Sequence, residues 1–258
     1  MLLTIDAGNT NVTVGIFDEA TLIASWRLRT IRDQTSDEWG IKLRSLFRAG
    51  DLDPRIITGV AIASVVPPLD QQLADVARRY FRCEAVFVSV DLDLGLKVAI
   101  DNPREAGADR LANVAAAFQK YGGPCIVVDL GTAINFDIVS AEGDFLGGII
   151  CPGIGIAISG LFEKAARLPL VDFREPRQLI GRNTVDCIQS GLYYSTISAI
   201  DGILDRLLVE LGSGTKIIGT GGQAKLMVSG SKYLKTIDED LTLDGVRMIW
   251  ERNAGRAV

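Results

Sequence analysis

The feature that most constrains this chain is a motif that occurs twice, about half a chain apart. An apolar run at the N-terminus ends in Asp6-Ala7-Gly8-Asn9-Thr10, and a second apolar run ends in Asp129-Leu130-Gly131-Thr132-Ala133. The two aspartates are 123 positions apart (129 − 6) in a chain of 258 residues. Each copy is followed by a pattern typical of a strand, a turn and a strand, with turns predicted at 18–19 and 141–144. The sequence therefore predicts an internal duplication of a strand–loop–hairpin unit.

The residues of this motif suit a loop that binds phosphate. Glycine has no Cβ, so its backbone can approach an anion closely, and successive N–H groups in such a turn form an anion-binding concavity. The aspartate at the strand end cannot bind phosphate itself, but it can hold a cation that does. Asp and Gly are also the ordinary residues of tight turns, and that alternative would suffice for one copy. Two copies with matching hairpins favour a polyphosphate held between two loops.

The composition excludes several other kinds of site. The chain has no histidine, which excludes a Ser-His-Asp triad and leaves a carboxylate, Lys, Tyr or Cys as the general base. The formal net charge is −5 and no basic stripe is visible, so nucleic acid is not an expected partner. No apolar run approaches the ~20 residues that span a bilayer, and no signal peptide precedes the first strand. We therefore expect a cytoplasmic protein without a membrane partner.

The four cysteines lie far apart in the sequence and have apolar neighbours. This spacing predicts reduced, buried thiols rather than a disulfide or zinc framework. They are Cys83, Cys125, Cys151 and Cys187.

The rest of the chain alternates strand and helix patterns, which is typical of an α/β fold. Thr35 and Glu38 predict a capping box that opens a helix. The apolar run 56–66 predicts a buried strand that ends before Pro67. We expect a helix after Pro67 and then a strand at 85–88. Later in the chain we expect helices at about 156–167, at 184–211 and from 241, and a strand at 216–219. We expect two subdomains, residues 1–120 and 121–258.

Asp109 and Arg110 stand in the first turn of a helix expected over about 108–120. An aspartate there is stabilised by the helix dipole, which is a purely structural explanation. An arginine in the same turn is unfavourable for the dipole, and a bound carboxylate would explain it. Because the chain has no histidine, Asp109 is the best general base, with a pKa that we expect the helix N-terminus to keep low.

At the level of whole motifs, the chain resembles the type III pantothenate kinases of the actin/hexokinase/Hsp70 ATPase superfamily. The two Asp-x-Gly loops resemble the phosphate loops of that superfamily, and the similarity extends in order over essentially the whole chain. Each further motif is weak alone, but their succession is specific. These motifs are Asn102-Pro103, Gly107-Ala108-Asp109-Arg110, Gly181-Arg182-Asn183-Thr184, Gln189-Ser190-Gly191, Gly219-Thr220-Gly221-Gly222 and Leu241-Thr242-Leu243-Asp244-Gly245.

The resemblance implies a fold, an activity and a set of site residues. The fold is a pair of duplicated ribonuclease H-like subdomains with mixed sheets and a nucleotide cleft between them. The activity is ATP-dependent phosphorylation of the primary hydroxyl of pantothenate to 4'-phosphopantothenate, the first step of coenzyme A biosynthesis. The ATP phosphates would contact Asp6, Ala7, Gly8, Asn9, Thr10, Asn11, Val12, Thr13 and Thr132. Pantothenate would contact Gly107, Ala108, Asp109, Arg110 and Thr184, with Asp109 as the catalytic base.

The resemblance also implies metal ions and a second subunit. Asp6 would hold Mg²⁺ through water, and Asp129 would lie at a monovalent cation, K⁺ or NH₄⁺. The family is homodimeric, and the helix at 184–211 carries more apolar surface than an exposed helix should. The alternative that this apolar face is ordinary core stays open. The face consists of Ile188, Leu192, Ile197, Ile200 and Leu204.

Two positions depart from the family pattern. Ile100 stands where the family has a tyrosine that contacts pantothenate, and residues 134–137 read Ile-Asn-Phe-Asp instead of Thr-Thr-Phe-Asp. Loss of one hydroxyl contact would weaken substrate binding by ~1 kcal/mol, and neither the base nor the phosphate loops are affected.

Two other functions compete with a pantothenate kinase. A phosphatase or sugar kinase with the same loops is disfavoured by the compact length and by the segment 107–110. A catalytically inactive regulatory or accessory relative is disfavoured because the chain retains Asp6, Asp109, Arg110 and Asp129 together.

Overall fold

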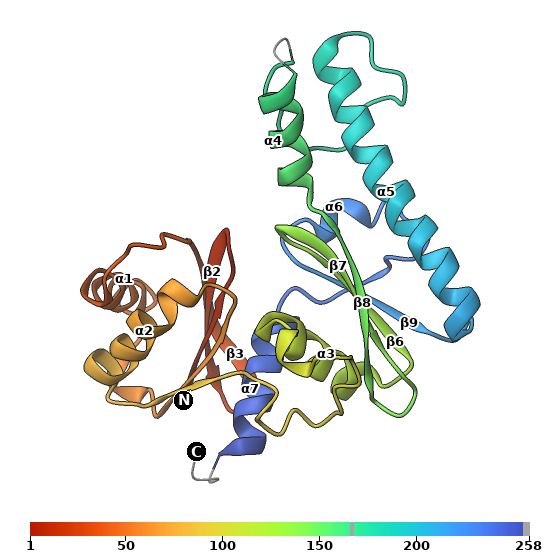
Figure 1. The fold of residues 1–258 in the computed structure, drawn as a ribbon. Helices are drawn as coiled ribbons and strands as arrows, with labels where there is room; N and C mark the ends of the chain where they lie inside the picture. The colour runs from red at the N-terminus through yellow and green to blue at the C-terminus, as the bar shows by residue number, and fades with distance from the viewer. Residues whose placement is uncertain (166–167, 255–258) are drawn as a thin grey trace. The chain divides into compact units, whose positions relative to one another are not determined.

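The computed structural model describes residues 1–165 and 168–254, which form two compact units. The first unit contains Met1–Lys120 and the segment that begins at Asp240, and the second contains Tyr121–Glu239. Figure 1 shows both units. The expected second subdomain, 121–258, thus differs from the second unit in its last segment, because the C-terminal helix packs in the first unit.

The first unit is a five-stranded sheet with helices on its faces. Its strands lie in the order β3-β2-β1-β4-β5, and only β1–β4 and β4–β5 pair in parallel. The strands are β1 (Leu2–Ala7), β2 (Asn11–Asp18), β3 (Thr21–Arg29), β4 (Gly59–Ser64) and β5 (Ala85–Phe87). The helices are α1 (Ser36–Ala49), α2 (Pro67–Val76), α3 (Ala108–Tyr121) and α7 (Leu241–Asn253), with short helical turns at Pro54–Ile56, Ala77–Phe81 and Pro103–Glu105.

The second unit repeats this architecture. Its strand order is β10-β9-β6-β7-β8, in which β6 corresponds to β1 and β9 to β4. The strands are β6 (Cys125–Leu130), β7 (Ala133–Val139), β8 (Phe145–Pro152), β9 (Lys216–Thr220) and β10 (Thr236–Ile237). The helices are α4 (Ile154–Lys164), α5 (Thr184–Leu211) and α6 (Ala224–Met227).

The predicted duplication is confirmed by strand order and by a shared irregularity. The β2–β3 hairpin shifts register between Ile16 and Phe17, and the β7–β8 hairpin does so between Ile138 and Val139. These shifts are 122 positions apart rather than 123. The second loop is one residue shorter, because Ala7 pairs with Val12 in the first copy and Leu130 pairs with Ile134 in the second. A bulge repeated at one place in both hairpins is a property of a duplicated fold.

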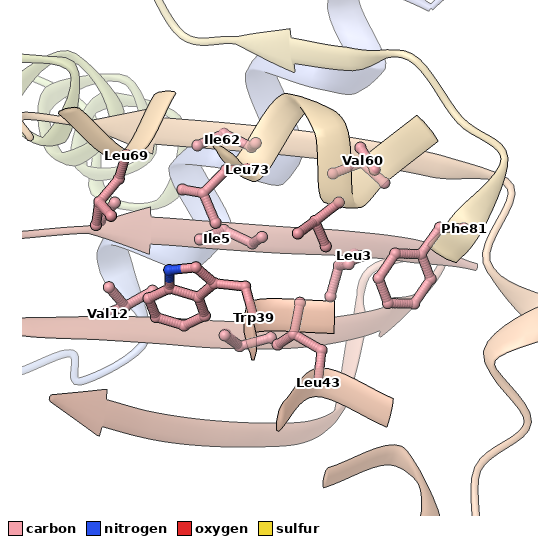
Figure 2. Packing of buried hydrophobic residues seen from close by; sticks show 14 of the residues in the cluster. Leu3, Ile5, Val12, Trp39, Leu43, Val60, Ile62, Leu69, Leu73 and Phe81 are labelled. Carbon is pink, nitrogen blue, oxygen red and sulfur yellow. The ribbon is translucent and has the colours of Figure 1, made fainter. Parts of the chain in front are cut away.

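The core of the first unit lies between the sheet and helices α1 and α2. Figure 2 shows Trp39 and Leu43 of α1 and Leu69 and Leu73 of α2 against the strands. The capping box of Thr35 and Glu38 is confirmed, and it starts α1 so that Trp39, Leu43 and Phe47 fall on its buried face.

Helix α7 covers the opposite face of the same sheet. A Cβ placed on Gly15 of β2 would lie 3.0 Å from Leu243, and one placed on Gly59 of β4 would lie 2.4 Å from Trp250. Close contacts also join α7 to α3: the Thr242 hydroxyl donates to Asn113 Oδ1 (2.7 Å), and Lys120 pairs with Asp244 (2.6 Å). These contacts explain why the last helix belongs to the first unit.

The apolar face of α5 belongs to the core of the second unit. Ile197, Ile200 and Leu204 are buried in the core cluster of this unit. Leu192 is buried beside the groove between α4 and α5, and Ile188 is half-buried. The alternative that this face is ordinary core is therefore confirmed for Ile197, Ile200 and Leu204, because they pack with the sheet of the same unit.

Three smaller expectations also need correction. The strand predicted over 56–66 is limited to Gly59–Ser64, because Pro54 starts a 3-10 turn that Asp53 caps. The helix expected over 156–167 begins two residues earlier, and its expected end at Arg167 lies outside the described residues. All four cysteines are free, but only Cys125 is buried and Cys187 is exposed.

In the part of the chain that the structure describes, no helix is long and apolar enough to cross a membrane.

Candidate active site

The first Asp-x-Gly loop is a tight connection between β1 and β2. Asp6 pairs with Thr13 across the two strands, so both side chains lie on one face of the sheet. The Gly8 N–H donates to the Asn11 carbonyl oxygen (2.9 Å) and closes the turn. Asn9, Thr10 and Asn11 are exposed at its tip, whereas Asp6, Gly8 and Thr13 are half-buried. Ala7 and Val12 are buried in the core, so at these two positions only the backbone is available to a ligand.

The second loop, between β6 and β7, is built in the same way. Asp129 is the penultimate residue of β6, and the Gly131 N–H donates to the Ala133 carbonyl oxygen (3.0 Å). Thr132 is exposed at the tip. Gly153, just before α4, lies so close to this loop that a Cβ would stand 2.1 Å from the Thr132 carbonyl oxygen.

Asp129 lies among groups that favour a cation. It pairs with Thr220 of β9 and Asn135 of β7, so the three side chains form a row across the sheet. A Cβ on Gly221, whose φ is +87°, would lie 2.4 Å from Asp129 Oδ1, so only glycine leaves room for the carboxylate. Asn135 Oδ1 is buried and accepts no hydrogen bond from the described residues.

Asp109 lies in the first turn of α3, which begins after the 3-10 turn at Pro103–Glu105. Its Oδ1 accepts the Arg110 backbone N–H (2.8 Å) and lies 2.5 Å from where a Cβ on Gly107 would stand. Burial raises the pKa of the Asp109 carboxyl, and the Arg110 N–H and guanidinium only partly offset this. The expectation of a low pKa was therefore wrong, because desolvation outweighs the helix N-terminus.

Val65 brings the first loop and the start of α3 to the same edge of the first unit. Its N–H donates to the carbonyl oxygen of Ala7 (3.0 Å), the residue between Asp6 and Gly8. Its Cγ1 lies 3.3 Å from the position of a Cβ on Gly107. The residue that follows β4 therefore contacts both segments, which are a hundred residues apart in sequence, and two of the predicted site segments lie together.

Thr184 is the first residue of α5, in the second unit. The Asn183 side chain caps this helix by accepting the Asp186 N–H (3.0 Å), and Thr184 itself is exposed. It lines a groove of about 470 Å³ between α4 and α5, together with Leu161, Cys187 and Ile188.

Sequence reasoning missed two residues that touch the first loop. The Thr30 hydroxyl donates to the Gly8 carbonyl oxygen (2.6 Å), and Arg32 Nη2 donates to Asn9 Oδ1 (3.2 Å). Both residues follow β3. The sequence did contain a signal for them, because counting residues back from the predicted turn of the hairpin places the end of its second strand beside the loop.

Comparison with known proteins identifies the family. Residues 2–206 match the family model described as type III pantothenate kinase. The type III pantothenate kinase of Solibacter usitatus is 59% identical over 98% of this chain and 97% of its own length. That of Myxococcus xanthus is 46% identical over 98% of this chain and 99% of its own. The chain belongs to the type III pantothenate kinase family.

As a member of this family, the protein transfers a phosphoryl group from ATP to pantothenate in coenzyme A biosynthesis. Solved structures of lower identity show the same fold. A Campylobacter jejuni protein named for the Baf family of transcriptional activators has a TM-score of 0.60 at 20% identity, with 98% of each chain covered. A Porphyromonas gingivalis protein described as an N-acetylglucosamine kinase has a TM-score of 0.53 at 15% identity, over 98% of this chain and 100% of its own.

Proposed function

We propose that the loops Asp6–Thr13 and Asp129–Ala133 bind the phosphates of ATP, and that Asp109 acts on the primary hydroxyl of pantothenate. The observation that carries this proposal is the shared edge of the first unit, where Val65 contacts both Ala7 and Gly107. A phosphate loop and a half-buried carboxylate at one edge are the two elements that phosphoryl transfer to an alcohol needs.

Asp109 serves this reaction as an orienting base. Phosphoryl transfer depends on position and charge neutralisation more than on covalent chemistry, so the carboxylate aligns the hydroxyl and accepts its proton as the bond to phosphorus forms. Burial raises the pKa of Asp109, which brings it closer to the operating pH and makes the carboxylate a stronger base. Its Oδ1 already accepts the Arg110 N–H, which fixes the orientation of the carboxylate.

Arg110 and Thr184 would bind the rest of the substrate. Pantothenate ends in a carboxylate, and a guanidinium binds such a group with two parallel hydrogen bonds. The exposed Thr184 hydroxyl, at the N-terminal end of α5, would add a hydrogen bond to the polar middle of the substrate.

The residues present fit the two metal ions that the family implies. The described residues contain no group of three His, Cys, Asp or Glu side chains that could cage a metal. Mg²⁺ is typically held by the phosphates of a nucleotide with one or two carboxylates, and here the half-buried Asp6 carboxylate would bind it through water. When bound, Mg²⁺ would neutralise charge on the phosphates. For K⁺ or NH₄⁺, the Asp129 carboxylate and the buried Asn135 Oδ1 on the same row offer oxygen ligands.

Replacing Arg110 with alanine is expected to raise the KM for pantothenate about 10-fold or more, with a smaller effect on kcat. A carboxylate anchor acts in the ground state and the transition state alike, so its loss appears mainly in KM. Because the Arg110 charge lowers the pKa of Asp109, the acid limb of the kcat profile should also move to higher pH. Arg110→Lys keeps the charge and should leave the acid limb in place. Equal defects in both parameters for both substrates would instead indicate a distorted helix start.

We also propose that the protein is a homodimer whose contact involves the projecting pair α4 and α5, shown in Figure 1. Apolar side chains are exposed on and beside these helices, more than an isolated surface should carry. They include Ile156, Leu161, Phe162, Leu170, Leu179 and Ile180, the last of which is 80% exposed.

Light scattering at micromolar concentration is expected to give twice the mass of the 27.8 kDa chain. Phe162→Glu, which places a charge on the exposed apolar surface of α4, should shift the protein toward the monomer because a desolvated charge opposes association. Val209→Glu, at an 88% exposed position near the far end of α5, is the matched control and should stay dimeric. A monomeric wild-type protein would contradict the proposal.

An assay of ADP release with and without pantothenate tests the function as a whole. Pantothenate-dependent release by the wild-type protein is expected, and its absence would favour the inactive regulatory relative. We propose that the reaction takes place in the cytoplasm, where ATP is present and thiols are kept reduced.

A further inference from the structure

The tip of the first phosphate loop is fastened by the segment that follows β3. The Thr30 hydroxyl donates to the Gly8 carbonyl oxygen (2.6 Å), and the Thr30 N–H donates to the Thr10 carbonyl oxygen (3.0 Å). One residue thus binds both sides of the turn. These two bonds fix the backbone of a turn of the kind whose successive N–H groups can form an anion-binding concavity.

Three arginines, in or just after β3, lie beside the same loop. Arg27 of β3 pairs with Thr13 and so extends the row that contains Asp6 and Thr13. Arg29, two residues later on the same face, pairs with Asn11. Arg32 follows two residues after Thr30, and its Nη2 donates to Asn9 Oδ1 (3.2 Å) at the exposed tip.

Among the described residues, these three arginines take part in no ion pair, whereas four other arginines of the first unit do. Arg55, Arg78, Arg79 and Arg104 each form an ion pair with a nearby aspartate. Among the ion pairs of the described residues, none involves Arg27, Arg29 or Arg32. Positive charge that is concentrated beside a loop and not neutralised by neighbouring carboxylates raises the local concentration of an anionic ligand.

We propose that Arg32 is a direct ligand of the ATP phosphates and that Thr30 is the positioning residue of the first phosphate loop. The ligand class is the polyphosphate of a nucleoside triphosphate, bound by a guanidinium that Asn9 holds at the loop tip. This inference rests on the proposed phosphate-binding function of the first loop. Arg27 and Arg29 contribute longer-range attraction from the adjacent strand.

The first test is a set of arginine variants assayed for both substrates. Arg32→Ala is expected to raise the KM for ATP about 10-fold or more, with the KM for pantothenate unchanged, because one charge-assisted contact to phosphate is lost. Arg32→Lys should recover part of the loss, since it keeps the charge without the planar fork. Arg48→Ala, on the exposed last turn of α1, removes the same charge from the same unit and should change neither KM.

Binding of Mg-ADP and of inorganic tripolyphosphate, measured by calorimetry, separates phosphate contact from effects on turnover. Both affinities should fall in Arg32→Ala by about the same factor as the KM for ATP rises. Thr30→Val, which keeps the shape and loses the hydroxyl, should weaken both ligands at an unchanged melting temperature. Thr30→Ser should restore them, because the serine hydroxyl can donate to Gly8.

Asp6→Asn distinguishes failure of this inference from failure of the function it rests on. If Arg32→Ala binds tripolyphosphate as Arg48→Ala does while Asp6→Asn has lost Mg-ATP, the inference is overturned and the loop assignment stands. If neither Arg32→Ala nor Asp6→Asn alters nucleotide affinity, both are overturned. If Arg32→Ala raised the KM for pantothenate but left the KM for ATP unchanged, the inference about Arg32 would also be overturned.

Discussion

Asp109→Asn is expected to lower kcat by about 10²–10⁴-fold while the affinity for ATP stays unchanged. Asparagine keeps the shape of the side chain and an oxygen that can accept the Arg110 N–H, so the start of α3 remains intact. It cannot accept a proton, and the loss of a general base has an effect of this size. Steady-state kinetics together with Mg-ADP calorimetry would measure the two quantities separately.

The same variant should be at least as stable as the wild-type protein at neutral pH. Burial raises the pKa of Asp109 in the folded protein, so the folded state binds this proton more tightly than the unfolded chain does. The contribution of Asp109 to stability is therefore greatest at low pH and falls as the pH rises through the raised pKa. Asparagine has no such pH-dependent cost, so a melting temperature at pH 7–8 equal to or above that of the wild type is expected.

Asp18→Asn is the matched control for this experiment. Asp18 is an exposed carboxylate at the opposite end of β2 from the phosphate loop, so kcat should not change. An Asp109→Asn enzyme with nearly full turnover would remove Asp109 from the mechanism. A large loss of stability in Asp109→Asn would mean that the carboxylate has the structural role of a helix-start residue.

Gly245→Ala is expected to destabilise the first unit by about 3 kcal/mol, the upper end of the usual cost of overpacking. A Cβ at this position of α7 would lie 2.0 Å from the carbonyl oxygen of Ala112 and 2.5 Å from its carbonyl carbon. Both are backbone atoms of α3, so a side-chain rotation cannot relieve the clash. The helices would have to separate, which would strain the contacts of Thr242 with Asn113 and of Lys120 with Asp244.

Calorimetric melting would measure this effect, with Gly202→Ala in α5 as the control. The nearest atom to a Cβ on Gly202 is Arg206 Nη1 at 3.5 Å, an ordinary contact. Alanine favours a helix over glycine by about 1 kcal/mol, so the control should be neutral or stabilising. If Gly245→Ala were stabilising too, the close approach of α7 to the backbone of α3 at Ala112 would be wrong.

Several parts of the site follow from the sequence because they depend on local patterns. The two Asp-x-Gly turns follow apolar strands and precede hairpins, and strand pairing with a period of two residues then fixes which side chains share a face. The capping box at Thr35 and Glu38 needs only hydrogen bonds within one helical turn, and α1 begins there as predicted. The start of α3 at Ala108, with Asp109 and Arg110 in its first turn, is equally local.

Other features depended on which distant residues pack together. Asp109 has a raised rather than a lowered pKa because tertiary burial outweighs the local helix N-terminus. The apolar face of α5 is core because the sheet of its own unit covers it, which the helical period alone cannot distinguish from a subunit contact. Gly245 is the last residue of the motif 241–245, but only the close packing of α3 explains why this position must be glycine.

The sequence by itself determined the duplication, the two loops and the residue types that can carry the chemistry, since these follow from short-range backbone geometry. Tertiary structure alone decided that Val65 contacts both Ala7 and Gly107 and that α7 returns to the first unit. Each of these contacts joins residues that are more than 20 positions apart. No local periodicity specifies such contacts, because they arise only when whole strands and helices pack and exclude water.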